Sequence, residues 1–305
     1  SGSVSSVLGL NISPINTGSL TNRGLELEIG HHLSSGDFTL DVQGNFNIVQ
    51  NEIETLGVGD VKQLNGLVGS GGLYIGYPMQ VYYGYQTDGV FLDVDDVKTW
   101  ADQTKVTPKA QVGDIRYKDI NGPDGAPDGK VDPNYDRVVL GTRIPKYTFG
   151  LGIQTSYKEF DAAVQMQGVA GVKGMLSGVA GFAMWQEGNV QRWQADGRFR
   201  SDIPERYPSY PRLETVSGGG SPNTEVSDFW VRDASYLRVR NVQLGYTLPK
   251  QWLHALHISG LRIYISGENL LTLSGYPRGW DPEINTNGRY YPIQQTYTLG
   301  LNIKF

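Results

Sequence analysis

Apolar and polar side chains alternate along much of the chain, the period-2 pattern that predicts β-strands, whereas helical periodicity is nearly absent. The pattern is clearest over residues 146–157, where one face of the expected strand is apolar and the other is small or polar. The apolar face consists of Tyr147, Phe149, Leu151, Ile153, Thr155 and Tyr157. A polar turn at 158–159 leads into a second alternating segment at 160–167. Together the two segments predict an antiparallel hairpin.

Other parts of the chain repeat this alternation. These segments are residues 25–29, 38–48, 236–248, 261–266 and 293–305. The turn sequence SSGD at 34–37 joins the first two in a second hairpin. In the segment 236–248 the apolar phase shifts between Val239 and Val242, which predicts a β-bulge.

The length of these segments and their aromatic ends favour strands that cross a membrane. Residues 146–157 and 293–305 exceed the roughly 5–6 residues usual in globular strands and suit the about 9–11 tilted residues that span a bilayer. Aromatic residues at the ends of the apolar faces predict a girdle at the lipid headgroups. They are Tyr147, Tyr157, Tyr236, Tyr246, Tyr297 and Phe305. The alternative is a soluble β-sandwich that buries one face of each strand.

Connections between the expected strands alternate between short and long, as in outer-membrane barrels with short periplasmic turns and long external loops. The short turns lie at 34–37 and 158–159, and the long loops span 51–145, 171–232 and 272–292. Counting back from a periplasmic C-terminus gives about seven strands. They are expected to start near residues 23, 37, 146, 160, 236, 260 and 293. Segments 81–91 and 114–118 form either a further strand pair or strands within an outer loop.

Seven strands do not close a wide barrel, and an open sheet in lipid leaves edge N–H and C=O groups unsatisfied. We therefore expect an all-β fold in which residues 1–305 form the C-terminal strands of a large antiparallel transmembrane β-barrel with long extracellular loops. The start at Ser1 agrees with an upstream portion that is missing from this chain.

Composition narrows the function classes. The 305 residues include no Cys, which excludes a disulfide, a thiolate nucleophile and a Cys-based zinc site. The net charge of −5 gives no basic surface for nucleic acid. No apolar run approaches the roughly 20 residues of a membrane helix. We found neither a Gly-x-Ser-x-Gly motif nor a phosphate-binding loop, so no catalytic residue is assigned and no enzymatic activity is expected.

Ordered stretches over nearly the whole chain resemble the C-terminal barrel region of the SusC/RagA-type TonB-dependent transporters of Bacteroidetes outer membranes. The stretches are NTGSLTNRGLELEIG (16–30), GYPMQVYYGYQTDGVF (76–91), the run from GDIRYKDING to AAVQMQGVAG (113–171), SYLRVRNVQLGYTLPK (235–250), LRIYISGENLLTLSGYPRGWDPE (261–283) and YYPIQQTYTLGLNIKF (290–305). Their number and order make a chance match implausible.

This resemblance implies a barrel of about 22 strands with a plug in its lumen. It also implies an outer-membrane location, a TonB–ExbB–ExbD complex that acts on the plug through the missing N-terminal part, and a SusD-like surface lipoprotein over the outer mouth. The plug domain and the TonB box are expected to lie outside this chain. The resemblance leaves open whether two transporter units pair.

One loop is rich in the hard oxygen ligands that calcium prefers. Its candidate ligands are Asp119, Asn121, Asp124, Asp128 and Asp132. The spacing differs from an EF-hand because Pro123 displaces the third acid and no Glu closes the loop. The family commonly carries a shorter Asp-x-Asn-Gly-Asp-Gly version. A Ca²⁺ ion is the only cofactor considered, and the alternative is a turn closed by its own Asx hydrogen bonds.

Other polar clusters have simpler interpretations. His254 and His257 are three residues apart, as two metal ligands on a helix would be, but no HExxH motif and no neighbouring acid accompanies them, and we interpret them as part of a short amphipathic turn. His31 and His32 face opposite sides of a strand and are interpreted as strand-end residues. The acids at 93–96 are interpreted as solvated loop residues.

The loop at 182–212 combines aromatic residues with arginines, a composition that suits sugar stacking or a protein interface. The aromatic members are Phe182, Trp185, Trp193, Phe199, Tyr207 and Tyr210. The arginines are Arg192, Arg198, Arg200, Arg206 and Arg212. Packing of these side chains against one another is the alternative.

Three functions follow from these observations. The first is active import of a bulky nutrient, an oligosaccharide ahead of a peptide, through a plugged barrel that makes and breaks no bond. The second is a secreted β-sandwich that binds or hydrolyses glycans. The third is a passive porin-like or adhesive barrel. No residue is assigned to substrate binding at this stage.

Overall fold

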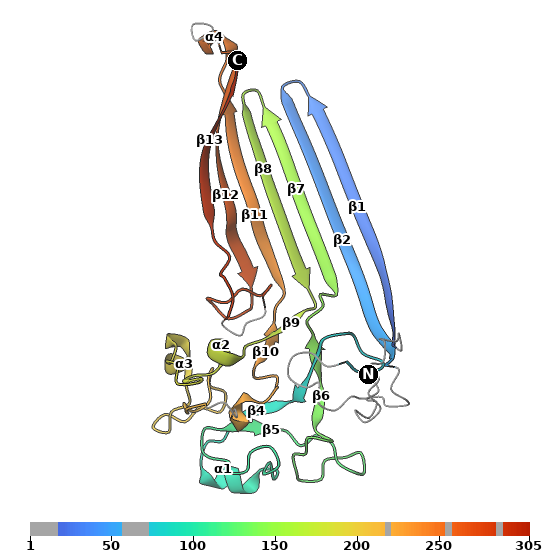
Figure 1. The fold of residues 1–305 in the computed structure, drawn as a ribbon, viewed down its shortest axis with the longest axis vertical. Helices are drawn as coiled ribbons and strands as arrows, with labels where there is room; N and C mark the ends of the chain where they lie inside the picture. Colours follow the sequence, from blue (N-terminus) through green and yellow to red (C-terminus); the bar gives the residue numbers. More distant parts are fainter. Residues whose placement is uncertain (1–17, 57–72, 217–220, 254–257, 285–288) are drawn as a thin grey trace, which may run out of the picture.

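The computed structural model describes residues 18–56, 73–216, 221–253, 258–284 and 289–305. Its main element is a curved sheet of seven antiparallel strands, with the longer loops gathered at one end (Figure 1). In spatial order the strands are β1 (Ser19–Ser35), β2 (Phe38–Thr55), β7 (Tyr147–Tyr157), β8 (Phe160–Ala170), β11 (Tyr236–Thr247), β12 (Gly260–Ser274) and β13 (Thr296–Lys304). The spatial order follows the sequence order, as the predicted up-and-down barrel segment requires.

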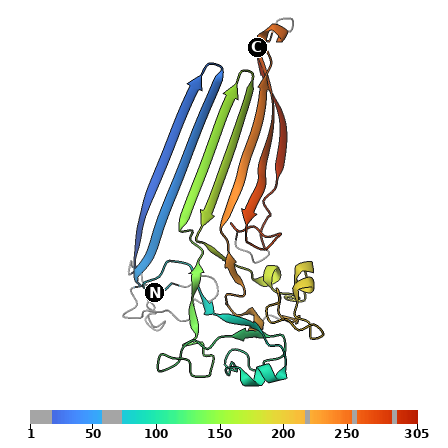
Figure 2. The ribbon, with the colours of Figure 1, turned by 180° about the vertical axis from the view of Figure 1, so that it is seen from behind.

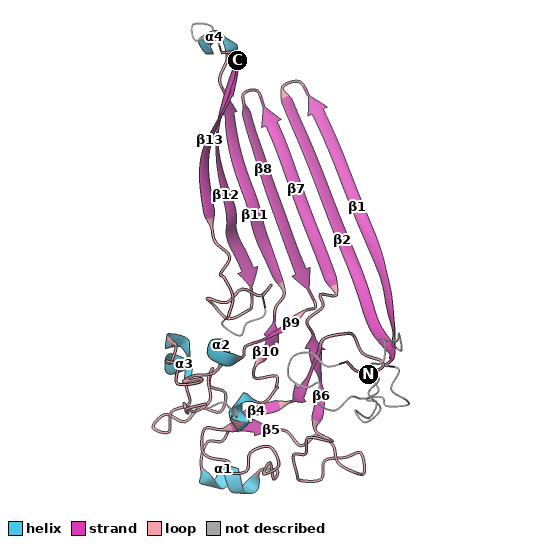
Figure 3. Ribbon diagram, in the orientation of Figure 1, coloured by secondary structure: helices cyan, strands magenta, loops and turns pink. Residues whose placement is uncertain are grey.

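The remaining elements are short and lie in the connections between these strands, as the view from behind also shows (Figure 2). The helices and strands are drawn in different colours in Figure 3. The short strands are β3 (Val81–Tyr85), β4 (Thr87–Val90), β5 (Ile115–Tyr117), β6 (Arg137–Thr142), β9 (Lys173–Met175) and β10 (Val231–Asp233). The helices are α1 (Val94–Thr99), α2 (Gly178–Gly181), α3 (Arg192–Gly197), α4 (Lys250–Leu253) and the 3₁₀ turn η2 (Pro222–Thr224).

The predicted strands are confirmed, and the open question about residues 81–91 and 114–118 is answered. Strand β3 pairs with β6, and β4 pairs with β5, in two-stranded sheets separate from the main sheet. These segments therefore belong to an outer loop rather than to a further pair of spanning strands.

Two tight turns set the register of the hairpins. Gly36 and Lys158 both adopt positive φ, at 59° and 53°. The last paired residues on either side of these two-residue turns are Ser35 with Phe38 and Tyr157 with Phe160. Two-residue turns of this handedness match the twist of antiparallel strands. Glycine adopts this conformation freely, whereas the lysine must accept some strain.

One face of the main sheet is apolar and exposed. Leu25, Ile29 and Leu299 expose 62%, 60% and 74% of their surface. A soluble sandwich would cover such residues with a second sheet, and none lies there in the described ranges. The exposed apolar band does not fit the sandwich alternative and matches the lipid-facing surface of transmembrane barrels.

None of the helices in the described part of the chain is long and apolar enough to cross a membrane.

Aromatic side chains mark the turn end of the apolar band. Phe160 and Tyr246 lie with their ring centroids 4.7 Å apart, and Tyr157 is paired with Phe160 across the hairpin. The prediction that Tyr236 belongs to the aromatic girdle is wrong. The Tyr236 side chain is only 5% exposed, and its hydroxyl accepts a hydrogen bond from Gln167 on the polar face. Alternation could not reveal this position because the apolar phase changes at the bulge that follows it.

The predicted β-bulge is confirmed. The register of β11 shifts between Val239 and Asn241 against both neighbouring strands. Against β8 the additional residue is Arg240, whereas against β12 the additional residue lies on β12, where Asn269 and Leu270 stand opposite Arg240. A bulge bends the strand and redirects side chains. Arg238 and Arg240, which flank Val239 at this bulge, both pair with Glu283 in the loop after β12.

The hydrophobic core lies outside the sheet, among the long loops. We call residues 73–145 and 171–235 the loop body. Its core centres on Trp230, which is 1% exposed and packs edge-on against Phe182, Tyr210 and Phe229 at centroid distances of 5.1, 5.7 and 4.9 Å. The long loops are therefore a packed unit with their own core.

Candidate functional site

The polar face of the main sheet, opposite the apolar band, carries a shallow trough that runs along β7. Its lining includes glycines of β7 and side-chain amides of the two neighbouring strands, and its volume is about 520 Å³. Strand pairing places these residues in two adjacent rows across the sheet. The rows are Gln43–Gly152–Gln165 and Asn45–Gly150–Gln167. The glycines form the floor of the trough, and the amides form its walls.

The amides of the trough are only partly engaged by the protein. Gln43 donates from Nε2 to Glu28 Oε1 at 2.8 Å, which leaves its own carbonyl oxygen free to accept. The side-chain amides of Asn45 and Gln165 make no hydrogen bond within the described residues. Unpaired amides along a polar face are available to a ligand that offers both donors and acceptors.

A buried arginine fixes the loop that follows β12. Arg238 is 1% exposed, and its guanidinium donates to Asp281 at 2.7 Å, Glu283 at 2.8 Å and Thr272 Oγ1 at 2.9 Å. A guanidinium has a planar set of donors suited to two carboxylates at once. Arg238 therefore holds residues 281–283 against the outer end of the sheet. This cluster was not predicted from sequence.

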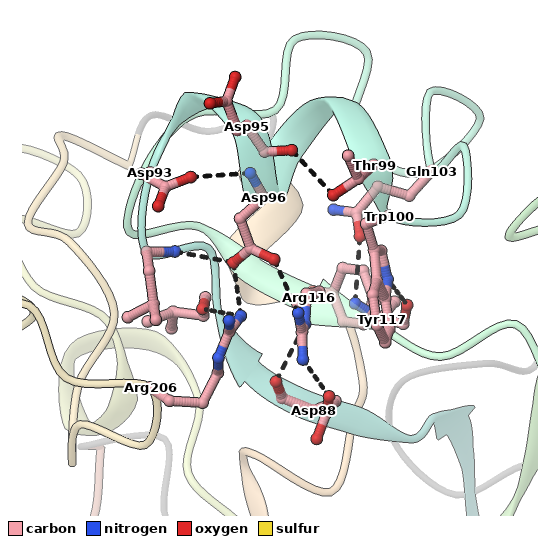
Figure 4. A network of polar contacts seen from close by, with 12 residues as sticks. Asp88, Asp93, Asp95, Asp96, Thr99, Trp100, Gln103, Arg116, Tyr117 and Arg206 are labelled. Atoms are coloured by element: carbon pink, nitrogen blue, oxygen red, sulfur yellow. Dashed lines mark hydrogen bonds and ion pairs between the residues drawn. The ribbon is translucent and has the colours of Figure 1, made fainter.

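A second ion-pair network joins separate segments of the loop body (Figure 4). Arg116 on β5 donates to Asp96 at 2.8 Å and also to Asp88, while its guanidinium lies 3.8 Å from the centre of the Trp100 ring. Arg206 donates to the other oxygen of Asp96 at 2.5 Å. The Arg116 side chain is 9% exposed and that of Asp96 is 13% exposed. Shared acceptors of this kind lock the participating segments together.

The three neighbouring acids of this region have different roles. Asp93 caps α1 by accepting a 2.8 Å hydrogen bond from the Asp96 backbone amide, and Asp95 is an exposed partner of Lys98 at 3.3 Å. The interpretation of Asp96 as a solvated acid is wrong, because it is the central acceptor of the network. Its partner Arg206 is 110 residues away, a separation that no local pattern reveals.

The network also sets the ionisation of Asp96. Burial acts to raise the pKa of this carboxyl group, but hydrogen bonds from the Leu92 amide and from Arg206, together with the charge of Arg116, outweigh burial and lower the pKa below 3.8. The pKa of Asp88 is also lowered. Both groups are therefore carboxylates at neutral pH.

Acidification is expected to weaken this ion-pair network at a higher pH than the pH at which the main sheet loses stability. Because both pKa values are lower in the folded chain than the unfolded value of 3.8, the stability that these groups add is complete above about pH 4 and is lost as the pH falls through the folded values. Hydrogen exchange of segment 88–117 relative to the β7–β8 hairpin, from about pH 7 to about pH 3, measures the loss. Equal protection of the two segments throughout would contradict the prediction.

A further buried acid ties the loops of the loop body together. Asp114 is 2% exposed and accepts hydrogen bonds from Arg212 at 2.5 Å and from Asn223 at 2.8 Å. Burial raises the pKa of Asp114 in spite of these two partners. Because Asp114, Arg212 and Asn223 come from three different segments, their hydrogen bonds join the loops of the loop body into one unit.

Some carboxylate oxygens of the candidate calcium loop already accept hydrogen bonds from the protein, whereas Asp119 Oδ1 is buried without a hydrogen-bond partner among the described residues. Asp119 accepts from the Gly129 amide at 2.6 Å, and Asp132 pairs with Lys105. The nearby Asp136, which was not among the candidates, accepts from the amides of Ile120 at 2.8 Å and Asp132 at 2.6 Å. No group of three or more His, Asp or Glu side chains within the described ranges is arranged to hold a metal ion. The calcium site stays a prediction.

The histidines divide into two groups. His32 lies on β1 and its Nδ1 is 2.5 Å from Asp41 Oδ1 across the strand pair. His31 is paired with Val42 and so lies on the opposite face, as predicted from alternation. His254 and His257 fall outside the described residues.

The aromatic residues predicted to offer an exposed stacking surface are mostly interior. Phe182, Phe199 and Tyr210 are 6%, 7% and 4% exposed, and Trp185 and Trp193 pack against the same core. Tyr207 is the exception at 66% exposed, with its hydroxyl 3.0 Å from Asp88. The alternative of mutual packing therefore accounts for most of this loop.

The arginines of the loop at 182–212 form ion pairs or hydrogen bonds with residues of the same loop or of neighbouring loops. Arg192 lies 3.3 Å from Asp196, Arg200 pairs with Asp202, Arg206 with Asp96 and Arg212 with Asp114, while Arg198 donates to the Ala195 carbonyl. What remains accessible is a cleft of about 640 Å³, lined in part by Trp193, Tyr207 and Phe229.

Comparison with known proteins gives relatives over nearly the full chain. No family model matches. The chain is 27% identical to TonB-dependent receptor P3 of Formosa agariphila over 95% of its length, and 28% identical to TonB-dependent receptor P26 of the same species over 97%. It is 25% identical to TonB-dependent receptor SusC of Bacteroides thetaiotaomicron over 95% of its length. The chain is similar over nearly its whole length to TonB-dependent receptors, SusC among them.

Solved structures agree with this assignment at the level of the fold. The RagAB peptide importer in its open-open state superposes with a TM-score of 0.72 at 21% identity, over 99% of this chain. Its closed-closed state gives 0.72 at 23% identity. The architecture predicted from the resemblance, an antiparallel sheet from the C-terminal region of a transmembrane barrel, is confirmed.

The chain spans less than a third of the length of these curated relatives. It covers 29% of receptor P3, 30% of receptor P26 and 27% of SusC. In a transmembrane barrel of this architecture, the apolar face of the sheet is the one turned to lipid and the polar face is the one turned to the lumen.

Proposed function

We propose that this chain is the C-terminal barrel portion of a TonB-dependent importer that moves a bulky nutrient across the bacterial outer membrane. The observation that carries the proposal is the two-faced sheet. Its apolar face is exposed, with Leu299 at 74% exposure, and its opposite face is lined by amides around a glycine floor. A sheet of this kind suits a wall between lipid and an aqueous lumen.

The two edges of the sheet support the need for further strands. Strand β1 pairs only with β2, and β13 pairs only with β12, among the described residues. Their outer edges present backbone N–H and C=O groups that lipid cannot satisfy. The rest of the barrel and the plug, supplied by the remainder of the protein, would pair these edges and fill the lumen.

The proposed partners are those that the relatives suggest. A SusD-like surface lipoprotein would cover the outer mouth beside the loop body, and a TonB–ExbB–ExbD complex would pull on the plug. No bond in the substrate is made or broken in this process. The sequence favours an oligosaccharide as cargo, and a peptide is the alternative that the fold shared with the RagAB peptide importer supports.

Two measurements test the importer proposal. The native protein is extracted from membranes in mild detergent, and its covalent and co-purifying partners are identified by mass and sequence. Uptake of a labelled oligosaccharide and a labelled peptide is then compared in cells with and without TonB. An upstream plug segment, a lipoprotein partner and TonB-dependent uptake support the proposal. Recovery of a lone water-soluble chain of 33.6 kDa would overturn it.

A further inference from the structure

The guanidinium of Arg232 has no polar partner in the loop body. Arg232 lies on β10 and forms neither a hydrogen bond nor an ion pair with any residue in the described ranges, although its Cζ lies 5.4 Å from the centre of the Phe229 ring. Burial lowers the pKa of Arg232, and the charge of Asp228 acts in the opposite direction. Arg232 is still a cation at neutral pH, and its five N–H donors are unused. A partly buried cation without an acceptor costs free energy, which a bound anion would recover.

Arg232 lines the accessible cleft of about 640 Å³ described above. This volume is in the range of about 300–1,000 Å³ that is common for ligand pockets. The lining comes from three connections between the strands of the main sheet, namely β4, parts of residues 176–232, and residues 275–277 after β12. None of the described lining residues belongs to the main sheet. The cleft is therefore formed by loops of this chain and not by the lumen-facing side of the barrel wall.

Two aromatic rings of the cleft are held in position by the surrounding loops. Tyr207 is 66% exposed, and its hydroxyl donates to Asp88 at 3.0 Å. The Tyr207 ring lies over Gly89, where an added Cβ would come within 3.0 Å of it. Trp193 packs edge-on against Tyr210 at a centroid distance of 5.5 Å. Rings that are fixed before binding lose little entropy when a ligand arrives, and their apolar faces suit the C–H face of a sugar ring.

The cleft also contains one carboxylate. Asp228 Oδ1 accepts from the Thr87 amide at 3.0 Å and from the Thr87 hydroxyl at 2.5 Å, while Oδ2 accepts no hydrogen bond from the described residues. Arg232 and Asp228 are the only charged residues of the described lining. A simple inorganic anion would be attracted by Arg232 but repelled by Asp228. A sugar acid offers a carboxylate to the guanidinium and hydroxyl donors to the carboxylate, so it satisfies both groups.

We propose that this cleft binds the ring of an acidic sugar, with the sugar carboxylate on Arg232, a sugar hydroxyl on Asp228 and the apolar face of the ring against Tyr207. Two sources at the cell surface carry this chemistry. One is an acidic oligosaccharide taken up as cargo, and this source rests on the importer function proposed above. The other is the headgroup of an outer-leaflet glycolipid, which does not depend on import.

The test uses the full-length transporter with its co-purifying partners in detergent. Calorimetry measures the binding of trigalacturonate, of its methyl ester, in which every carboxylate is neutralised, and of inorganic sulfate. The variant Arg232→Gln removes the charge, and Tyr207→Ala removes the exposed ring. The control is Arg200→Gln, which removes one positive charge from an exposed pair with Asp202 outside the cleft. Because Arg232 has no hydrogen-bonded partner, its replacement leaves no acceptor of the protein unpaired.

Trigalacturonate is expected to bind the wild-type transporter about tenfold or more tightly than it binds Arg232→Gln, because the variant loses a charge-assisted hydrogen bond. The methyl ester is expected to bind wild type and Arg232→Gln equally weakly, and Tyr207→Ala is expected to weaken the binding of both sugars. Arg200→Gln is expected to change neither. The proposal is overturned if wild type binds the ester as tightly as the acid or binds neither, if sulfate binds as tightly as trigalacturonate, or if Arg200→Gln weakens binding as much as Arg232→Gln.

Two further measurements separate the sources of the sugar. Loss of labelled trigalacturonate uptake in cells with Arg232→Gln, with uptake of a neutral maltooligosaccharide retained, supports the proposal and identifies cargo as the source. Retained uptake of both, with weaker binding of purified lipopolysaccharide to the variant, supports it and identifies a glycolipid headgroup. Uptake that does not require TonB would contradict the importer proposal, whereas calorimetric binding that depends on Arg232 would still support the sugar site.

Discussion

Replacing Arg238 with alanine is expected to lower the free energy of unfolding by about 3–5 kcal/mol, because removing one partner of a buried ion pair leaves the others uncompensated. Arg238 is 1% exposed, and the side chain of Asp281 is 14% exposed. Without the guanidinium, Asp281 loses its ion-pair partner at a site with little access to water. The released segment 275–284 is expected to become sensitive to protease while the main sheet stays intact.

Arg240→Ala is the matched control. Arg240 pairs with Glu283 at 3.2 Å, but its side chain is 31% exposed, and a partly solvated pair contributes about 1 kcal/mol or less. Urea unfolding of the full-length transporter in lipid vesicles, with proteolysis of the loop at 275–284, compares the two variants. Equal loss of stability in both would show that burial of Arg238 is not what anchors this loop.

The sheet could be predicted from sequence because each strand has two chemically different faces. In β7 the contrast between Ile153 and its neighbours Gly152 and Gln154 sets the face of every residue, since a shift by one position would reverse all of them. The turn at Lys158 and the bulge after Val239 could also be predicted from sequence, because both interrupt the same period-2 pattern.

The trough could not be predicted because it depends on pairing between distant strands. Gln43 and Gln165 reach the same row only when β2 and β8 both pair with β7 in one particular register. Alternation assigns each amide to the polar face but does not say which residues stand beside it. The nearest sequence indication was the pair of glycines on the polar face of β7.

The loop body was the least predictable part for a related reason. Its ion pairs join residues as distant as Asp96 and Arg206, and its aromatic residues follow no strand or helix period. Composition correctly indicated that aromatic and arginine side chains gather in 182–212, but composition does not distinguish an exposed stacking surface from an interior. Burial of Tyr210 and Phe182 against Trp230 shows that most of this material forms a core.

Introducing a charge on the apolar band is expected to have the next largest effect. Ile153 lies in a row of apolar residues with Val42, Val164 and Val242, and it lies between the aromatic residues Phe149 and Tyr157 of its own strand. This position corresponds to the middle of the lipid-facing band. Ile153→Arg is expected to destabilise the folded barrel by about 2–4 kcal/mol, because a guanidinium at the bilayer midplane loses its hydration.

The adjacent residue provides the control, because alternation turns it to the opposite side of the same strand. Gln154 is exposed on the polar face, so Gln154→Arg keeps its charge away from lipid and is expected to change stability by about 0.5 kcal/mol or less. The measurement is urea-induced unfolding of the full-length transporter in phospholipid vesicles, which gives the free energy of unfolding of each variant. A larger loss for Gln154→Arg than for Ile153→Arg would reverse the assignment of the two faces. Equal small losses would show that the apolar band does not lie in lipid.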